Sequence, residues 1–331
     1  MNNMKFYSIN KSELAQKTFE LLESSNDDSN LKIDKFSDGE FQPVFKESIR
    51  DEVVYILADG SSSEDIMKLC LTIDAATRSG CYKVNVIYPF APYSRQDKLK
   101  NGIRSSISAR TLANMLQSVG LDKLITIELH AGSIMGMYDV PVIHLNGNKI
   151  FTDYLRNLNI SDVCICPPDA GAVERNKDLS KVFPDSVTAM IEKTRVKFNE
   201  ISSMILIGQE NVKGRNVILG DDILDTGGTL SKASHLLKEK CALTLRAVIT
   251  HFVASGNALE NIYNSSIDEL IVSDTVFGTM EKVEYYNRHF TTPNSSGIIP
   301  KITVISCSDL ISNSIKRLNS KLSINELNMI E

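Results

Sequence analysis

The chain has 331 residues, which is long for one compact domain and favours two packed domains. Hydrophobic residues make up 42% and charged residues 23%, an ordinary composition for a soluble globular protein. The formal net charge of −5 argues against a protein that binds nucleic acid or an anionic membrane, because either would carry a basic surplus.

No stretch of the sequence approaches the roughly 18 consecutive apolar residues of a membrane span. The N-terminal residues resemble neither a signal peptide nor a transit peptide. The six cysteines are scattered, with no pair at CxxC spacing, so we expect reduced and mostly buried thiols in a cytoplasmic protein. Cys164 and Cys166 would share one face of a strand, where two core thiols are expected rather than a metal site.

Short runs rich in valine and isoleucine alternate with amphipathic segments along most of the chain. In the first half, we expect strands over 53–58, 84–88 and 124–129 and helices over 63–78 and 108–119. In the second half, we expect strands over 163–166, 187–191, 204–207, 217–219, 245–252 and 270–272 and helices over 172–182 and 229–240. Continuous apolar strands alternating with helices predict parallel, right-handed βαβ units and a doubly wound α/β fold.

The alternation is long enough for two such sheets in tandem, with a break near residues 146–148. We therefore expect a first domain over 1–146 and a second over 147–306. A last strand over 302–306 and a helix over 309–318 follow, and residues 307–331 are expected to pack back on the first domain. The polar, aperiodic stretch 285–300 is predicted to be a surface loop.

The strongest chemical signal is residues 217–229, VILGDDILDTGGT. A buried strand delivers two adjacent acids, and a turn with two glycines then opens a helix. Such a turn wraps an anion with backbone N–H groups at a helix N-terminus, and carboxylates beside it suit ribose hydroxyls or hydrated magnesium. A simple tight turn with Asp225 as the N-cap is the alternative, but the complete Asp-Asp-x-x-Asp-Thr-Gly-Gly-Thr string weighs against it.

That string is the phosphoribosyl-pyrophosphate signature. Type I phosphoribosyltransferases, which consume the compound, share it with phosphoribosyl pyrophosphate synthetases (ribose-phosphate pyrophosphokinases), which make it. From about residue 35 to about residue 318 the chain resembles the synthetases. The resemblance implies two tandem domains of type I phosphoribosyltransferase-like fold. It also implies magnesium-dependent transfer of the β,γ-pyrophosphoryl group of ATP to the anomeric hydroxyl of ribose 5-phosphate, giving phosphoribosyl pyrophosphate and AMP.

Two segments match the parts of the synthetases that bind ATP. One is FSDGE at 36–40, which could otherwise be a polar turn, and the other is PYSRQD at 92–97, just beyond a strand end. Arginine offers a forked donor geometry for ATP phosphates. The residues that the resemblance assigns to ATP are Phe36, Asp38, Gly39, Glu40, Arg95, Gln96 and Asp97.

Two further segments match the metal-binding and nucleotide-binding parts of the family. They are IELHA at 127–131 and PPDAGA at 167–172, where Pro167 and Ala172 depart from the usual Ser and Gly. The resemblance implies that His130 and Asp169 bind Mg²⁺. Without it, His130 would be read as an ordinary surface or core histidine.

The resemblance also places a catalytic lysine and arginine at Lys193 and Arg195, on a loop that closes over the phosphates. Cations aimed at the nonbridging oxygens stabilise the charge of phosphoryl-type transfer. The residues assigned to ribose 5-phosphate are Arg195, Asp221, Asp222, Asp225, Thr226, Gly227, Gly228 and Thr229.

Two alternatives stay open on the sequence. A phosphoribosyltransferase would explain residues 225–229 but not 36–40, 95–97 or His130. A catalytically silent regulatory subunit would share the fold but depart at catalytic segments, which are present here. The family further implies a homo-oligomer, commonly a hexamer, with activation by phosphate and inhibition by ADP. Departures at 98–102, 132–138 and 285–300 bear on regulation rather than on the chemistry.

Overall fold

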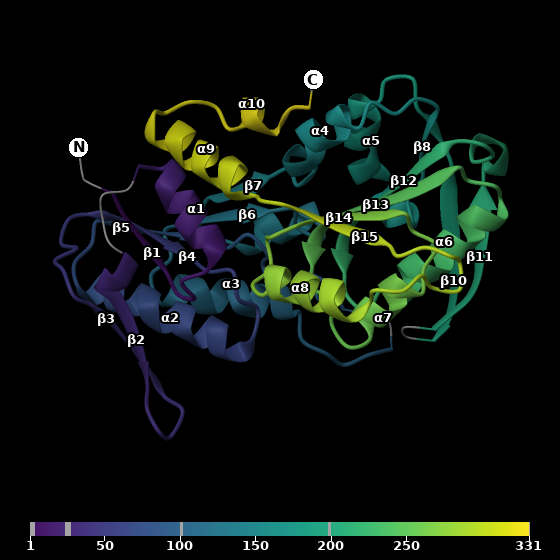
Figure 1. Cartoon of the computed structure of the whole chain (residues 1–331). Helices are drawn as coiled ribbons and strands as arrows, with labels where there is room; N and C mark the ends of the chain where they lie inside the picture. The colour runs from purple at the N-terminus through teal and green to yellow at the C-terminus, as the bar shows by residue number, and fades with distance from the viewer. Residues whose placement is uncertain (1–3, 24–27, 100–101, 198–199, 331) are drawn as a thin grey trace. The chain divides into compact units, whose positions relative to one another are not determined.

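The computed structural model describes residues 4–23, 28–99, 102–197 and 200–330. The chain divides into two compact units (Figure 1). Unit 1 comprises Met1–Asn146, Thr275–Phe277 and Cys307–Asn328, and unit 2 comprises Gly147–Asp274, Gly278–Ser306 and Met329–Glu331. The chain thus leaves unit 1 after Asn146 and returns to it twice.

Unit 1 is built on a five-stranded parallel sheet with the strand order β1-β4-β5-β6-β7. Its strands are β1 (Met4–Ser8), β4 (Val53–Leu57), β5 (Lys83–Ile87), β6 (Lys123–Ile127) and β7 (Val142–Leu145). Its α-helices are α1 (Glu13–Leu21), α2 (Ser63–Arg78), α3 (Ser108–Ser118), α9 (Ser308–Asn319) and α10 (Asn325–Asn328), with short 3-10 turns at Asp28–Asn30 and Gly132–Met137.

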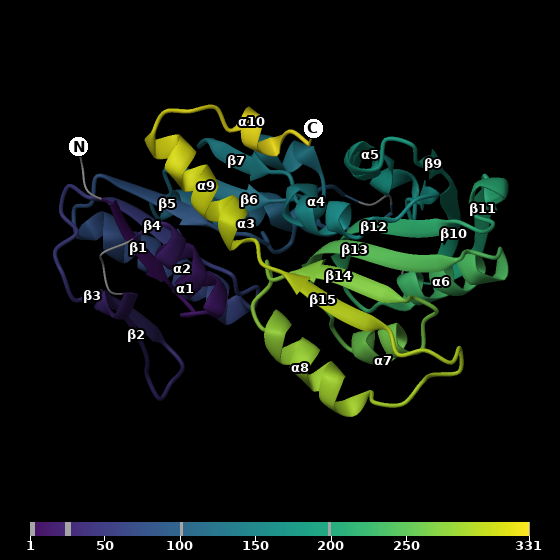
Figure 2. The same ribbon diagram turned by 45° about the horizontal axis from the view of Figure 1, so that its top comes forward.

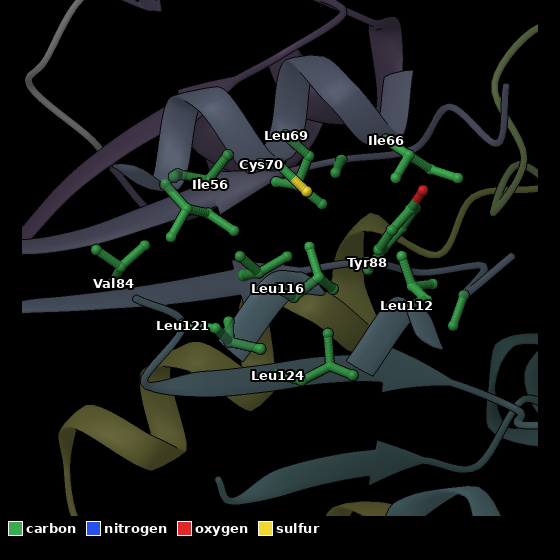
Figure 3. Close-up of a cluster of buried hydrophobic side chains, with 14 of the residues drawn as sticks. Ile56, Ile66, Leu69, Cys70, Val84, Tyr88, Leu112, Leu116, Leu121 and Leu124 are labelled. Carbon is green, nitrogen blue, oxygen red and sulfur yellow. The ribbon is translucent and has the colours of Figure 1, made fainter. Parts of the chain in front are cut away.

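Helices cover both faces of this sheet. On one face, apolar side chains of α2 and α3, such as Leu69 and Leu116, pack against Ile56 and Val84 of the strands (Figure 3). On the other face, Phe6 of β1 lies 5.8 Å, centroid to centroid, from Phe19 of α1. These apolar runs form covered strands because burial of each such side chain contributes about 1.5–3 kcal/mol.

The helix α2 begins as its sequence dictates. Ser62 accepts a hydrogen bond from the backbone N–H of Asp65, and the Asp65 carboxylate accepts one from the Ser62 N–H. This reciprocal capping box satisfies two of the N–H groups that a helix start leaves without partners. The predicted helix over 63–78 is confirmed at both ends.

A separate antiparallel hairpin, β2 (Leu31–Lys35) and β3 (Phe41–Phe45), also belongs to unit 1. An ion pair of 2.7 Å between Lys35 and Glu64 joins it to α2. Its tip, residues 36–40, projects away from the five-stranded sheet (Figure 1).

Unit 2 is built on a six-stranded parallel sheet with the order β15-β14-β13-β12-β8-β9. Its strands are β8 (Val163–Ile165), β9 (Val187–Thr188), β12 (Asn216–Leu224), β13 (Thr244–Phe252), β14 (Glu269–Ser273) and β15 (Lys301–Ile305). Its helices are α4 (Asn148–Asn157), α5 (Val173–Val182), α6 (Gly228–Glu239), α7 (Ala258–Tyr263) and α8 (Thr279–His289), with 3-10 turns at Ala170–Ala172 and Gln209–Asn211.

Successive side chains of β12 point into two different cores. Val217 and Leu219 pack in the core that includes α6, α7 and α8, whereas Ile218 packs in the core that includes α4 and α5. Figure 2 shows these two groups of helices on opposite faces of the sheet. Cys164 of β8 and Cys166, directly after it, are free, buried thiols in the same core, as predicted. The predicted α/β class, with two tandem parallel sheets each covered on both faces, is therefore confirmed.

Two predicted loops are wrong in part. Residues 196–203 were expected to belong to a polar loop, but β10 (Met190–Lys197) pairs antiparallel with β11 (Glu200–Ile207). The β-branched residues Thr194 and Val196 fit an extended hairpin despite the polar composition. Residues 285–289 were expected to be loop, but they form the end of α8, which buries Tyr286 against the sheet.

Among the helices of the described part of the chain, none has the length and apolar character needed to cross a membrane.

Candidate functional site

The glycine-rich turn lies at the carboxyl end of β12 in unit 2. β12 ends at Leu224, and α6 begins at Gly228 directly after Gly227. Gly227 has a φ of +74°, in the left-handed region that glycine adopts without strain, and it is the N-cap of α6. The turn thus aims a helix N-terminus and successive backbone N–H groups at one place, an arrangement suited to a phosphate. Residues 225–229, which include Asp225, Thr226, Gly228 and Thr229, are called the cradle below.

Two carboxylates lie just before the cradle. Asp221 and Asp222 are inside β12, which runs five residues farther than the predicted strand end at 219. Arg175 of α5 approaches both acids, with N···O distances of 3.8 Å to Asp221 and 3.5 Å to Asp222. Burial and the neighbouring carboxylates of Asp222 and Asp169 raise the pKa of Asp221 well above its ordinary range, and the Arg175 guanidinium opposes that shift.

Asp169 and Lys193, which lie 24 residues apart in the chain, form an ion pair in the structure. The Lys193 ammonium donates to an Asp169 carboxylate oxygen at 3.0 Å, and its side chain is only 5% exposed. The other Asp169 oxygen accepts from the N–H of Ala172 at 3.1 Å, which caps the turn before α5. The structure therefore brings a proposed metal ligand and a proposed catalytic cation together.

The backbone of Arg195 lies in β10, opposite Ile201 of β11. Its side chain lies outside the part of the chain whose side chains the structure describes. Its assigned role therefore stays a prediction.

Sequence reasoning missed the residues that hold this edge together. Asn176 of α5 is buried, and its amide donates to the backbone oxygens of Gly220 and Ala172, each at 2.8 Å. It thereby joins the turn after Asp169 to the strand that carries the two acids. The sequence does place Arg175 and Asn176 shortly after the predicted ligand Asp169. Only the tertiary contacts show which groups these two side chains touch.

The nucleotide residues predicted for unit 1 follow neighbouring strands. Residues 95–97 come after β5, and His130 comes after β6, so both lie beyond carboxyl ends of adjacent parallel strands. Gln96 accepts a hydrogen bond from the Ser108 hydroxyl at 2.6 Å, at the start of α3. Arg95 and His130 are exposed.

The backbone that leads to His130 is held by a second histidine that the sequence analysis did not identify. The N–H of Leu129 donates to Nε2 of His144 on β7 at 2.9 Å. Glu128 has a φ of +41°, a left-handed conformation that is uncommon for a residue with a side chain. His144 therefore supports a sharp change of chain direction at the end of β6.

The other predicted nucleotide segment is the tip of the β2–β3 hairpin. Phe36 is 49% exposed, and its N–H donates to the Glu40 carbonyl at 2.8 Å. Gly39 has a φ of +98°, and the Asp38 carboxylate accepts from the Glu40 N–H at 3.1 Å. Because the tip projects from the five-stranded sheet, the structure does not bring it to residues 95–97 within one unit (Figure 1).

Within the described residues, no group of three or more His, Cys, Asp or Glu side chains could hold a metal by itself. Mg²⁺ keeps several waters and is commonly bound by one or two carboxylates together with substrate phosphates. Asp169, 37% exposed at the sheet edge beside two further acids, offers the oxygen ligands that Mg²⁺ requires.

Family models and known relatives match nearly the whole chain. Residues 4–120 match a family model described as the N-terminal domain of ribose phosphate pyrophosphokinase, and residues 137–286 match a phosphoribosyl transferase domain. Ribose-phosphate pyrophosphokinase 1 of Streptococcus mutans is 37% identical over 98% of this chain and 97% of its own. The chain belongs to the ribose-phosphate pyrophosphokinase family.

A second relative and a solved structure also match nearly the whole chain. The ribose-phosphate pyrophosphokinase of Vibrio cholerae is 33% identical over 99% of both chains. The crystal structure of phosphoribosylpyrophosphate synthetase from Mycobacterium smegmatis superposes with a TM-score of 0.83 at 30% identity, covering 97% of this chain and all of that one.

Proposed function

We propose that this protein is a ribose-phosphate diphosphokinase. It transfers the β,γ-pyrophosphoryl group of ATP to the anomeric hydroxyl of ribose 5-phosphate and releases phosphoribosyl pyrophosphate and AMP. The observation that carries the proposal is the edge of the unit 2 sheet, where the cradle, the Asp221–Asp222 pair and the Asp169–Lys193 ion pair lie together. Full-length relatives with this activity in their names support it.

The sugar phosphate binds through complementary groups on this edge. The cradle holds the 5-phosphate with backbone N–H groups and with the hydroxyls of Thr226 and Thr229. Asp221 and Asp222 accept hydrogen bonds from the ribose hydroxyls. The Arg175 guanidinium lies next to both acids and opposes the upward shift that burial and the neighbouring carboxylates give the pKa of Asp221.

Mg²⁺ is the cofactor that this set of residues fits, with Asp169 in unit 2 and His130 in unit 1 as its proposed protein contacts. When bound, Mg²⁺ would neutralise charge on the ATP phosphates and polarise the phosphorus that is attacked. Residues 36–40 and 95–97 are the proposed contacts of ATP.

Positioning and electrostatics supply the catalysis. The anomeric hydroxyl oxygen attacks the β-phosphorus in line and releases its proton to solvent, the bond from that phosphorus to the α,β-bridging oxygen breaks, and AMP leaves. Lys193 and Arg195 stabilise the negative charge that develops on the nonbridging and leaving oxygens. The ion pair with Asp169 limits the conformations of the Lys193 side chain before the substrates bind.

We also propose a homo-oligomer, a hexamer in its complete form. The projecting hairpin supports this proposal, because its tip matches a nucleotide-binding segment and yet stands apart from residues 95–97 of its own unit (Figure 1). An exposed Phe36 on such an arm is suited to completing the nucleotide site of a second copy.

The first experiment is an AMP-release assay with the full chain, Mg²⁺, ATP and ribose 5-phosphate, in which the products are resolved by mass. We expect AMP and phosphoribosyl pyrophosphate in equal amounts, and only when the sugar phosphate is present. Consumption of phosphoribosyl pyrophosphate with a nucleobase would instead show a phosphoribosyltransferase. Nucleotide binding without AMP release would show a catalytically silent subunit.

A further inference from the structure

The backbone that enters the cradle is held from one side by the segment that follows β13. Three successive carbonyl oxygens of the chain, those of residues 224, 225 and 226, accept hydrogen bonds from this segment. The bonds run from Ala254 N to Leu224 O at 2.9 Å, from Ser255 N to Asp225 O at 2.9 Å and from Asn261 Nδ2 to Thr226 O at 2.8 Å.

These three hydrogen bonds also set the direction of the backbone N–H groups in the cradle. The described backbone has no cis peptide bonds, so each C=O is antiparallel to the N–H of the next residue. Fixing the carbonyls of residues 224–226 toward the β13–α7 segment therefore directs the N–H groups of residues 225–227 away from it. Successive N–H groups on one side of a turn form the concavity that binds phosphate.

Asn261 makes the only side-chain bond of the three. It lies on α7, half-buried beneath the turn. A methyl group added at Gly227 would lie 3.3 Å from the Ala258 oxygen and 3.4 Å from Asn261 Cβ, which shows how closely helix and turn approach. The peptide between Thr226 and Gly227 leads into the N-cap of α6, and without a side-chain donor beneath it this peptide could rotate its N–H out of the cradle.

We infer that Asn261 is a positioning residue for the 5-phosphate of ribose 5-phosphate, acting by fixing the orientation of the Thr226–Gly227 peptide. The inference rests on the proposed function. It concerns a residue that contacts the cradle from behind and does not touch the substrate. Its loss should therefore weaken sugar-phosphate binding while leaving the nucleotide residues of unit 1 unaffected.

The test compares Asn261→Asp, Asn261→Ala and Asn261→Gln with the control Asn264→Ala. Aspartate keeps the shape of the side chain but offers no N–H donor, whereas glutamine retains the donor on a longer arm. Asn264 is an exposed residue at the C-cap of the same helix. KM for ribose 5-phosphate, KM for ATP and kcat are measured for each variant, and calorimetry measures binding of ribose 5-phosphate without nucleotide.

For Asn261→Asp and Asn261→Ala we expect KM and Kd for ribose 5-phosphate to rise roughly tenfold or more, as when a hydrogen bond to a charged group is weakened. KM for ATP should stay within about twofold, and Asn261→Gln should recover part of the loss. An unchanged KM for ribose 5-phosphate in both variants overturns the inference, as does an equal rise in both KM values. Absence of phosphoribosyl pyrophosphate formation by the wild-type protein would instead overturn the proposed function.

Discussion

At the scale of single residues, Lys193 shows how a partner can fix the side chain of a proposed catalytic residue. The Lys193 side chain is only 5% exposed, and an unpaired buried charge is costly. Asp169 supplies the partner and lies near Asp221. The ion pair therefore fixes the position of the Lys193 side chain.

Replacing Lys193 with alanine should lower kcat far more than it changes either KM. Loss of one group that stabilises transition-state charge costs about 10²–10³ in kcat. Steady-state kinetics with both substrates checks this. Lys181→Ala is the matched control, because Lys181 is an exposed lysine paired with Asp178 on the surface of α5. Full activity of Lys193→Ala would remove the lysine from the mechanism.

Glu269, in unit 2, couples stability to pH. Its buried carboxylate accepts from Tyr154 at 2.6 Å, Thr303 at 2.7 Å and Lys301 at 2.9 Å. Burial by itself raises the pKa of Glu269, but these hydrogen bonds and the Lys301 charge outweigh it, so the net shift is downward. A lowered folded-state pKa contributes stability above the unfolded-state pKa and loses it as pH falls through the folded-state value.

We therefore expect Glu269→Gln to cost about 1–3 kcal/mol in free energy of unfolding at pH 7. The difference from the wild type should shrink once pH falls below the usual glutamate range of about 4.3. Urea unfolding at several pH values measures this, with the exposed Glu260→Gln as control. A difference that stays constant down to pH 3, or grows, would contradict the assignment.

At the scale of elements, the contact between α5 and β12 sets the geometry of the sugar-phosphate edge. Gly220 is required there for space. A Cβ on it would lie 2.5 Å from both Asn176 Oδ1 and Leu179 Cδ1. The helix that follows Asp169 can approach the strand of Asp221 this closely only because residue 220 has no side chain.

Gly220→Ala should push α5 outward, destabilise the protein by about 1–3 kcal/mol and lower activity with ribose 5-phosphate. Thermal unfolding and KM for ribose 5-phosphate test this. Gly136→Ala is the control, because a Cβ there meets nothing within 4 Å. A variant with unchanged stability would show that α5 and β12 can separate at no cost.

At the scale of the whole molecule, the β2–β3 hairpin predicts that active sites are shared between copies. A variant with Phe36→Ala and Asp38→Ala has a defective hairpin, and Lys193→Ala has a defective transfer site. If hairpins serve neighbouring copies, co-expressing the two nearly inactive variants should restore about one quarter of wild-type activity. Half of the randomly formed pairs of copies are mixed, and one of the two sites in each mixed pair has both an intact hairpin and an intact transfer site. If each hairpin serves its own copy, co-expression restores nothing.

The fold class and the glycine-rich turn after β12 can be predicted from local patterns in the sequence. Apolar runs such as 53–58 and 245–252 are long enough to be recognised as covered parallel strands, because burial on both faces removes polar alternation. The turn of the cradle could also be predicted, because the residues of its Asp-Thr-Gly-Gly-Thr motif are adjacent in the sequence. The helix over 63–78 carries its own capping box.

Contacts between distant segments determine which residues surround the cradle and the neighbouring acids. Arg175, Asn176, His144 and Asn261 are ordinary polar residues in the sequence, and each contacts a partner 15 to 47 positions away, the nearest being the 15 between Leu129 and His144. The β10–β11 hairpin was likewise missed, because pairing between its strands outweighs the polar composition of 196–203. Local patterns specify turns and covered strands, whereas contacts between distant segments depend on how the strands are ordered in the sheet.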